Sequence, residues 1–419
     1  MYYKKKNMSW GFTLACNLAL GILGSSIAAP IKTVPWNGHI GAVSFTFDDA
    51  LETQALNMKP LLDAMPDVRV TFFLTGYQNR LIDNAAGFAA LAYAGNEIGN
   101  HTIIHWHLTL ESDNELEEDV VKNADFTEAV LAKHGADVQI VSFATPFCEN
   151  NAHLKTFINK RHFINRDCGL EGRNKWDTEP DWMGIDAKIW APPGTTINEM
   201  LSALDTAAYI GNFDNTNPFV PQITGGSWLV ILMHDVSENL AIPYVIMPDQ
   251  IKTLFERAVR NKLWVAPLGT IGAYHRAHFI FDKAPMKKTE DGYSVKWDIP
   301  HKYMPKSVPL RVRIDTTQFG ENVTIEQDGK IISPENDGTY IIEFMSKSLI
   351  LRNTGEISLP IASRIKQNRK AYKFTFFDLK GKPLGIVNDF AVPEKFSKGI
   401  YIIRAEAEGM PTVTKKVAR

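Results

Sequence analysis

Two spacings of hydrophobic residues divide the chain. From about residue 38 to residue 277, short runs of β-branched and aromatic residues alternate with longer segments of helical spacing. The expected strands are 42–47, 68–74, 140–143, 162–164, 228–232 and 263–265, and the expected helices are 51–65, 88–93, 114–134, 197–209 and 245–261. Strands separated by helices pair in parallel through right-handed crossovers. About six or seven such units favour a β/α barrel over an open sheet.

Beyond about residue 281 the pattern changes to alternating polar and apolar positions, which is typical of antiparallel strands with one buried face. The alternation covers 293–297, 310–314, 323–325 and 339–342. Turn signals such as Asp328-Gly329 and Asp337-Gly338 separate these runs. We therefore expect a barrel domain at 30–280, an accessory β-sandwich at 281–358 and a β-rich C-terminal domain at 359–419.

Residues 1–29 are predicted to be a signal peptide. Lys4, Lys5 and Lys6 precede a mostly apolar stretch without charge at 10–27, and small residues stand before Pro30. An uncleaved membrane anchor is the alternative. No other stretch is long and apolar enough to span a bilayer. We therefore expect a secreted or cell-surface protein that has no membrane span after cleavage.

Composition and charge narrow the classes of function. Hydrophobic residues make up 45% and charged residues 22% of the chain, as in an ordinary soluble globular protein. The formal net charge is -2, so no basic excess indicates nucleic acid as a partner. Once the leader is set aside, Cys148 and Cys168 are the remaining cysteines. An exported protein permits them to form a disulfide, and the pairing stays open.

Residues that carry chemistry follow two of the expected strands. Asp48 and Asp49 end the first strand, where a β/α barrel has its catalytic face, although a solvated turn or a helix N-cap is the alternative. The i, i+4 spacing of His101 and His105 puts two imidazoles on one side of a helical turn and suits a divalent metal. A loop with satisfied histidines is the alternative. The chain has no His-Glu-x-x-His motif, so a metalloprotease of that type is not supported.

Two further segments add candidates. His234 closes an apolar strand, where a histidine serves as a general acid or base or as a core residue with a backbone partner. Asp181-Trp182 lies in a loop region, where a carboxylate beside a large aromatic would tune a histidine and wall a pocket.

Together these pieces resemble the polysaccharide deacetylases with a NodB-homology domain, carbohydrate esterase family four, over residues 38–277. Residues 46–49 resemble the first motif, TFDD, and residues 101–105 the second, H-S/T-x-x-H. Residues 143–147 stand at the place of the third motif, R-x-P-Y. Asp181-Trp182 resembles the fourth motif, and residues 232–235 resemble the fifth, L-x-H. The resemblance implies a deformed (β/α) barrel of the NodB deacetylase type.

The resemblance also implies a metal site. Asp49, His101 and His105 would hold a divalent metal, with zinc first and cobalt, nickel or manganese as alternatives. Three protein ligands and an open position suit catalytic zinc. The metal would lower the pKa of a water and polarise the acetyl carbonyl. Asp48 would act as the general base toward that water.

Other residues would serve the leaving group and the acetyl group. His234 would be the general acid, and Asp181 would orient it and stabilise its charged form. The backbone N–H of Phe147 would donate to the oxyanion. Leu232 and Trp182 would form an apolar slot for the acetyl methyl.

One motif departs from the family. Ala144 stands where the third motif has an arginine that pairs with the catalytic base. Arg166 ends the next expected strand, and neighbouring parallel strands lie about 4.8 Å apart. We predict that Arg166 supplies the missing guanidinium, with pairing to Asp167 or solvent as the alternative. A bridge between Cys148 and Cys168 would bring the two strand ends together.

The C-terminal domain resembles the sorting domains of type IX secretion substrates. The cues are a D-x-x-G-K turn at 378–382, a G-I-Y-I-I-R strand at 399–404 and a basic finish. Type IX secretion machinery is therefore an expected partner, and an ordinary final β domain is the alternative.

The first choice of function is a secreted, metal-dependent hydrolase that removes acetyl groups from a polysaccharide or oligosaccharide. N-acetyl groups of chitin or peptidoglycan and O-acetyl groups of xylan both fit, because metal, base and acid serve carbon–nitrogen and ester bonds alike. The rival is a non-catalytic glycan-binding surface protein on a degenerate barrel, which the missing arginine favours. The intact metal ligands, base and acid favour the enzyme.

Overall fold

The structure is a computed structural model, which describes residues 31–169, 171–208, 226–289, 292–315, 323–353, 373–377, 382–387, 400–406 and 413–418. The chain forms two compact units, which divide between residues 353 and 354. The signal peptide expected at residues 1–29 lies outside the described residues. In the described parts of the chain, no helix has the length and apolar character needed to cross a membrane.

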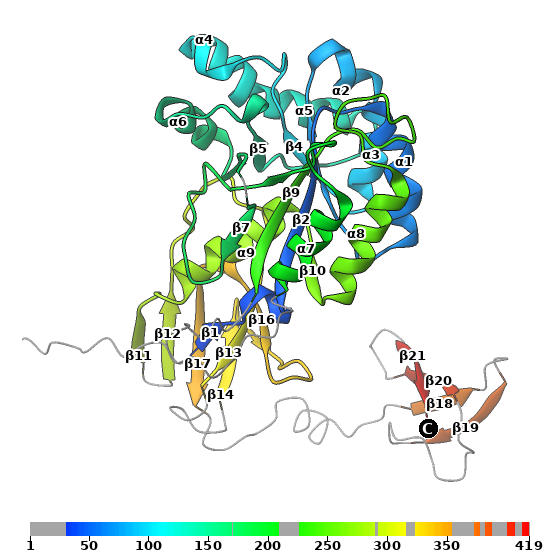
Figure 1. Cartoon of the computed structure of the whole chain (residues 1–419). Helices are drawn as coiled ribbons and strands as arrows, with labels where there is room; N and C mark the ends of the chain where they lie inside the picture. The colour runs from blue at the N-terminus through cyan, green and yellow to red at the C-terminus, as the bar shows by residue number, and fades with distance from the viewer. Residues whose placement is uncertain are drawn as a thin grey trace, which may run out of the picture. The chain divides into compact units, whose positions relative to one another are not determined.

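A curled, largely parallel sheet forms the centre of the first unit (Figure 1). Its parallel strands are β2 (Gly41–Phe47), β3 (Thr71–Leu74), β4 (Glu97–Asn100), β5 (Ser142–Ala144), β6 (Ile164–Arg166), β9 (Ser227–Met233) and β10 (Leu263–Val265). The order across the sheet is β6-β5-β4-β3-β2-β9. β10 pairs with the first residues of β2, and β3 pairs with its last residues. β2 is buried along its whole length, as expected for a strand covered on both faces.

The segment 182–190 closes this sheet into a deformed barrel. Ile185 bridges in parallel to Arg166 of β6, and β8 (Lys188–Ile189) pairs in parallel with the end of β9. β7 (Arg173–Lys175) pairs with the start of β9 in the antiparallel direction. Because β6 and β9 share this segment as a neighbour, the two ends of the sheet meet and enclose an interior.

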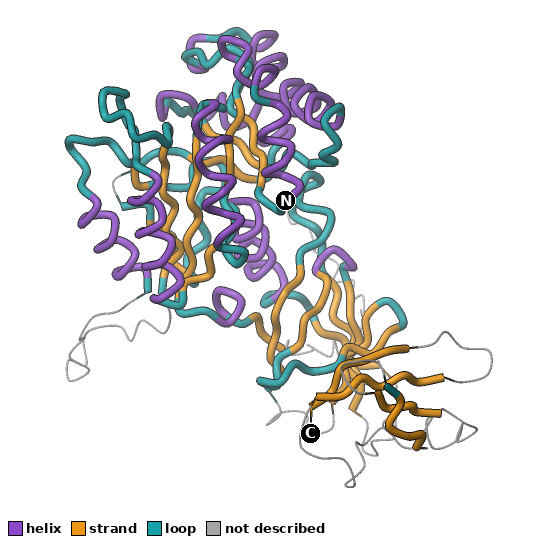
Figure 2. The backbone as a smooth tube through the Cα atoms, turned by 90° about the vertical axis from the view of Figure 1, so that its right-hand side faces the viewer, coloured by secondary structure: helices purple, strands orange, loops and turns teal. Residues whose placement is uncertain are grey.

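Helices surround the sheet (Figures 1 and 2). They are α1 (Glu52–Ala64), α2 (Arg80–Asp83), α3 (Ala85–Tyr93), α4 (Asp113–Leu116), the π-helical η4 (Glu117–Lys122), α5 (Asn123–Ala132), α6 (Ala152–Arg161), α7 (Ile197–Ala207), α8 (Pro248–Arg260) and α9 (Leu268–Phe281). α8 shows why such a segment is helical: Pro248 occupies the first turn, Arg257 and Arg260 occupy the last, and its buried residues recur at helical spacing. Its Phe255 packs on Phe45 of β2, with 4.8 Å between ring centroids.

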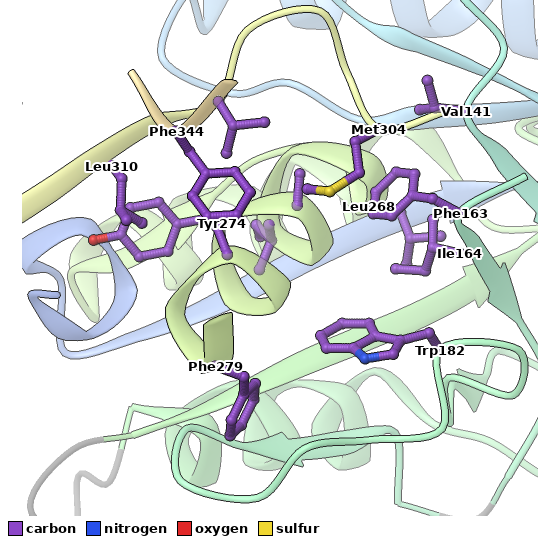
Figure 3. Packing of buried hydrophobic residues seen from close by; sticks show 14 of the residues in the cluster. Val141, Phe163, Ile164, Trp182, Leu268, Tyr274, Phe279, Met304, Leu310 and Phe344 are labelled. Atoms are coloured by element: carbon purple, nitrogen blue, oxygen red, sulfur yellow. The ribbon is translucent and has the colours of Figure 1, made fainter. Parts of the chain in front are cut away.

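α9 joins the barrel interior to the strands that follow it. Figure 3 shows side chains of α9 between those of the barrel and those of the later strands. The labelled α9 residues are Leu268, Tyr274 and Phe279; the barrel contributes Val141, Phe163, Ile164 and Trp182; the later part of the unit contributes Met304, Leu310 and Phe344. All of these residues belong to one buried hydrophobic cluster.

Two antiparallel sheets complete the first unit, with strand orders β1-β13-β16 and β11-β12-β17-β14-β15. Their strands are β1 (Ile31–Thr33), β11 (Met286–Thr289), β12 (Gly292–Lys296), β13 (Pro309–Ile314), β14 (Val323–Gln327), β15 (Lys330–Ile332), β16 (Tyr340–Glu343) and β17 (Ser348–Asn353). β1 precedes the barrel in the chain but pairs with β13. The barrel and the sandwich therefore share one compact unit, and the division that we expected at residue 281 is not a division between compact units.

The second unit contains one antiparallel sheet of order β19-β18-β20-β21. Its strands are β18 (Lys373–Phe377), β19 (Pro383–Val387), β20 (Ile400–Glu406) and β21 (Val413–Ala418). The turn that resembles a sorting signal lies mostly outside the described residues. The likeness to a type IX sorting domain stays a prediction.

The predicted fold class, a deformed barrel followed by β-rich regions, is confirmed. Each expected barrel strand is present, with boundaries shifted by a few residues. The hydrophobic pattern does not predict β4, because Glu97 and Gly99 interrupt its apolar run. It also does not predict α9, whose residues are buried on nearly all sides and therefore show no polar face.

The buried carboxylate of Glu97 fixes the start of α9 to the sheet. Its Oε2 accepts hydrogen bonds from Thr71 Oγ1 of β3 at 2.9 Å and from the N–H of Gly269 at 2.8 Å. Its Oε1 accepts a hydrogen bond from Ser142 Oγ of β5 at 2.7 Å. Burial raises the pKa of Glu97, and these hydrogen bonds offset only part of that rise.

We expect Glu97→Ala to lower the free energy of unfolding by about 2–4 kcal/mol, because it leaves buried donors without an acceptor. Urea unfolding followed by circular dichroism measures the change. Glu238→Ala, at an exposed position, is the control and should change the value by less than about 0.5 kcal/mol. Equal stability of the two variants would contradict this role of Glu97.

Candidate active site

The candidate residues gather at the carboxyl ends of the barrel strands, an edge called the mouth below. Asp48 and Asp49 follow β2, His101 follows β4, Arg166 ends β6 and His234 follows β9. In a parallel barrel these ends lie at one edge, which is where catalytic residues gather. Residues far apart in the chain thus meet because their strands run in the same direction.

Asp49, His101 and His105 form a compact group. Asp49 Oδ1 lies 3.6 Å from His101 Nε2 and 3.3 Å from His105 Nε2. One ligand atom of each residue lies within 4.8 Å of the others. The two imidazole ring centroids are 4.9 Å apart. The structure thus brings together the three residues that the sequence analysis assigned to a metal.

The backbone that brings the two histidines together is a loop. The helical turn that we expected from the i, i+4 spacing is absent from residues 101–107, and Thr102 and His105 have φ of 68° and 51°. Asp119 accepts hydrogen bonds from the N–H groups of Ile103 and Ile104, and Thr102 Oγ1 accepts one from the N–H of His105 at 2.9 Å. These side-chain acceptors replace the hydrogen bonds of a helix. Positive φ is strained for such residues and is often found at functional sites.

His101 is held as a neutral imidazole with Nε2 free for a ligand. Its Nδ1 lies 2.8 Å from the carbonyl oxygen of Ala144, so Nδ1 carries the proton and donates it. Burial lowers the pKa of His101 to about 4, and the nearby carboxylates offset only part of this effect. A neutral imidazole with a fixed tautomer is the form that binds a metal.

The pKa values of Asp49 and His105 are shifted in opposite directions. Burial alone would raise the pKa of Asp49, but the contact with His105 and the neighbouring imidazoles hold it well below its usual range. Burial alone would lower the pKa of His105, but the carboxylate of Asp49 outweighs it and leaves that pKa raised. Arg80, which the sequence analysis did not single out, adds a positive charge 3.6 Å from Asp49 Oδ2.

These residues fit a divalent metal. Asp49 Oδ1 is buried and accepts no hydrogen bond within the described part of the chain, which leaves a carboxylate oxygen facing two imidazoles. Two imidazole nitrogens and one carboxylate oxygen are a ligand set of catalytic zinc sites, with room for a further ligand.

Arg166 contacts Asp48 across the barrel interior. Arg166 Nη2 donates to Asp48 Oδ2, and both side chains are almost completely buried. The structure thus places a guanidinium on the expected base, from the strand where the sequence analysis looked for it. Asp48 Oδ1 is also buried and has no hydrogen-bond partner among the described residues. Arg166 therefore anchors Oδ2, which also lies 3.8 Å from His101 Nε2, and Oδ1 has no partner in that part of the chain.

Two further links hold the strand ends in place. A disulfide joins Cys148 after β5 to Cys168 after β6. Gln54 of α1, which the sequence analysis did not single out, is fully buried and donates through Nε2 to the carbonyl oxygens of Asp48 and His234. A polar residue at a buried face of a helix is the only sequence signal for such a role.

The predicted pairing of Asp181 with His234 is wrong. Asp181 Oδ2 accepts a hydrogen bond from Lys155 Nζ at 2.5 Å, and its Oδ1 accepts one from the N–H of Met183. The segment 182–190 runs parallel to β6 with Ile185 beside Arg166, so Asp181 precedes this segment, and its carboxylate faces α6 (Ala152–Arg161) instead of His234. His234 Nδ1 is buried and has no hydrogen-bond partner among the described residues.

Trp182 also lies away from the mouth. Its ring packs against His275 and Arg276 of α9, and its Nε1 donates to Glu179. Leu232 is buried near the end of β9, beside Ile189 on β8. The predicted acetyl slot between Trp182 and Leu232 therefore loses Trp182, while Leu232 keeps a place near the mouth.

Phe147 lies next to the metal ligands. It belongs to η5 (Pro146–Cys148) after β5 and has a φ of 55°. Its ring is half-exposed and lies 4.8 Å from that of His105. The role of its backbone N–H as an oxyanion donor stays a prediction.

The first part of the barrel is similar to a known protein family. Residues 37–162 match the family model described as polysaccharide deacetylase. The match covers β2 to α6 with Asp48, Asp49, His101 and His105, which is less than half of the chain. No curated protein matches the chain.

Solved structures of carbohydrate esterase family 4 are similar at low identity. The Xyl-CE4 domain of a multidomain xylanase from the hindgut metagenome of Trinervitermes trinervoides is 16% identical, over 54% of this chain and 87% of that chain, with a TM-score of 0.35. The family 4 carbohydrate esterase from Streptomyces lividans, solved with acetate, is 20% identical, over 53% and 88%, with a TM-score of 0.33. A family 4 pseudoenzyme from Bacillus anthracis is 15% identical, over 54% and 64%, with a TM-score of 0.35.

The raised pKa of His105 predicts how metal affinity depends on pH. A metal must displace the proton of His105, so affinity for zinc should rise about tenfold per pH unit below the pKa of His105 and level off above it. His101, with a pKa of about 4, stays neutral between pH 6 and pH 8 and adds nothing there. Isothermal titration of metal-free protein with zinc in this range measures the affinity and the released proton.

His107→Gln is the control, because His107 lies next to the group but outside it. The variant should keep the same dependence on pH. Zinc affinity that does not change between pH 6 and pH 8 in the unaltered protein would rule out a protonated His105.

Proposed function

We propose that this chain is an exported, metal-dependent deacetylase that hydrolyses acetyl groups on a polysaccharide or oligosaccharide. The observation that supports it most is the buried pair of Asp48 and Arg166 beside the group Asp49, His101 and His105. The proposed hydrolysis needs both parts, because the metal would activate the water and the base would take its proton.

Asp49, His101 and His105 would hold the metal, most simply zinc, which when bound lowers the pKa of a water and polarises a carbonyl. Asp48 accepts the proton of the attacking water on its unpartnered Oδ1, while Arg166 fixes Oδ2. The guanidinium also compensates the charge of a carboxylate that is almost entirely out of water. Asp48 therefore stays in one orientation through the proton transfer.

His234 is the candidate general acid. It follows β9, which lies on one flank of β2, whereas the strands that lead to His101 and Phe147 lie on the other flank. The side chain of Gln54 donates hydrogen bonds to the backbone carbonyl groups of both His234 and Asp48. This shared contact sets the distance between the candidate acid and the candidate base. Leu232 and Phe147 border the place of the acetyl group. N-acetyl groups of chitin or peptidoglycan and O-acetyl groups of xylan both suit this set of residues.

Export is part of the proposal. The leader pattern at residues 1–29 supports it, and so does the disulfide between Cys148 and Cys168, because such bonds persist in oxidising compartments. The tail at 359–419 is the proposed address for type IX secretion.

One observation favours a second candidate, a glycan-binding surface protein without activity. His234 Nδ1 has no hydrogen-bond partner among the described residues, so nothing there fixes the imidazole in the tautomer that an acid needs. Metal content together with acetate release from acetylated xylan, chitin oligosaccharides and peptidoglycan fragments separates the two. A protein that binds zinc but releases no acetate from any of them is the binding protein.

Asp48→Asn should lower acetate release by about 10²-fold or more while zinc content stays at that of the unaltered protein, because it removes the base and not a ligand. Acetate is measured by an enzyme-coupled assay and zinc by mass spectrometry. Asp83→Asn, on the exposed side of α2, is the control. Activity of Asp48→Asn within a few-fold of the unaltered protein would show that the base is another group.

Arg166→Ala should lower kcat/KM by about 10²-fold with zinc retained, because Asp48 is then free to turn. The kcat/KM of Arg166→Lys should lie between that of Arg166→Ala and that of the unaltered protein. It should also lower the free energy of unfolding by about 3–5 kcal/mol, since it leaves a buried charge unpaired. Arg173→Ala, at an exposed arginine of β7, is the control. If kcat/KM of Arg166→Ala stays close to that of the unaltered protein, Arg166 does not position the base.

A further inference from the structure

Exposed aromatic side chains are concentrated at the mouth of the barrel. Among the described residues the exposed aromatic side chains are Tyr77, Tyr93, Trp106, Phe126, Phe147 and Tyr244. Tyr77, Trp106, Phe147 and Tyr244 follow the carboxyl ends of β3, β4, β5 and β9. We call these four residues the aromatic rim. Tyr93 and Phe126 lie on the helices α3 and α5.

The rim surrounds the candidate metal ligands. β5, β4 and β3 lie side by side on one flank of β2, and β9 lies on its other flank (Figure 1). Tyr77, Trp106 and Phe147 therefore stand on one side of Asp48 and Asp49, and Tyr244 stands on the other. The rim thus extends on both sides of the place where an acetyl group would react.

Ring contacts tie the rim to the site itself. The ring centroid of Phe147 lies 4.8 Å from that of His105, and that of Tyr77 lies 6.3 Å from it. On the other flank the ring of Tyr244 lies 5.3 Å from that of His234. A molecule that covers these rings would therefore also cover the metal ligands and the candidate acid.

Trp106 offers the largest ring of the rim. Its side chain is 53% exposed, and its ring meets that of His107 edge to face at 5.2 Å. His107 in turn stacks on Phe147 at 4.3 Å and pairs with Glu149 at 2.9 Å. Trp106 thus stands on a supported row of rings, although half of its own surface faces solvent.

Exposed rings next to hydrogen-bonding groups suit a carbohydrate chain. A pyranose ring has an apolar C–H face, which covers an aromatic ring, and hydroxyl groups at its edge, which need polar partners. His107, Glu149 and Thr109 supply such partners beside Trp106. Exposed aromatic groups on both flanks of a site mark a ligand groove more often than isolated surface rings do.

We propose that the aromatic rim binds a polysaccharide chain across the mouth, with Trp106 and Tyr244 as stacking platforms on opposite sides of the metal site. This inference rests on the proposed function, since it places the acetylated sugar between the two platforms. It adds the two side chains of this chain, Trp106 and Tyr244, that would hold the sugars on either side of the acetylated one.

The test measures glycan binding in the Asp48→Asn background, so that hydrolysis plays no part. Affinity electrophoresis in gels that contain acetylated xylan, glycol chitin or soluble peptidoglycan gives the dissociation constant for each polymer. Trp106→Ala and Tyr244→Ala should each weaken binding of the preferred polymer about tenfold. Trp106→Phe should keep most of the affinity, because a ring remains. Tyr93→Ala, which removes an exposed ring on α3, is the matched control and should bind as the parent does.

The outcomes separate the two proposals. Absence of binding to all three polymers, or affinities of Trp106→Ala and Tyr244→Ala within about twofold of the parent, overturns the rim. A loss of similar size in Tyr93→Ala overturns it too. Binding that depends on Trp106 and Tyr244 supports the rim even where the unaltered protein releases no acetate, and in that case only the proposed hydrolysis fails. Zinc content and thermal unfolding show whether each variant is folded. If Trp106→Ala does not fold, Trp106→Phe and Tyr244→Ala still test the rim.

Discussion

The buried ion pair between Asp48 and Arg166 depends on the closure of the barrel. β3, β4 and β5 separate β2 from β6 in the sheet, so a flat sheet would hold these two strands about 19 Å apart. The segment 182–190 draws β6 toward β9 and curls the sheet until the two side chains meet in the interior. Two buried charges are tolerated because each compensates the other. The contact between Asp48 and Arg166 is therefore a consequence of closure and not of any local sequence.

Much of the site was predictable because parallel strands share one edge. An apolar run that ends in Asp48-Asp49, and another that ends in His234, place these residues at the mouth as soon as the strands are assigned. Arg166 was predictable for the same reason, since the end of β6 lies beside the end of β5, where Ala144 stands. The alternation of strands and helices sufficed for the fold class. In each case, the place of a residue at the end of an apolar run determines its place at the mouth of the barrel.

The errors arose where position depends on pairing register or on backbone angles. Nothing in the sequence around Asp181 indicates that the segment beside β6 begins after it, so the sequence does not predict that its carboxylate pairs with Lys155 of α6. No local pattern indicates positive φ at Thr102 or His105, so the i, i+4 spacing of the two histidines predicts a helical turn where the chain forms a loop. The pairing of β1 with β13 joins segments at the two ends of the unit. Such long-range pairings leave no trace in a local hydrophobic pattern.

The accessory sheets pack with the barrel in one buried core. Trp297 of the sandwich is buried between Phe281 and Phe344, and the ring of Tyr303 lies under the guanidinium of Arg161. Phe281 and Phe344 cover the ring of Trp297, and the ammonium group of Lys302 also lies over the ring of Tyr303. The sandwich adjoins the end of the barrel where β2 begins, opposite the mouth (Figure 1). Because α9 packs against both parts in one core, the barrel and the sandwich support each other as a single packed unit.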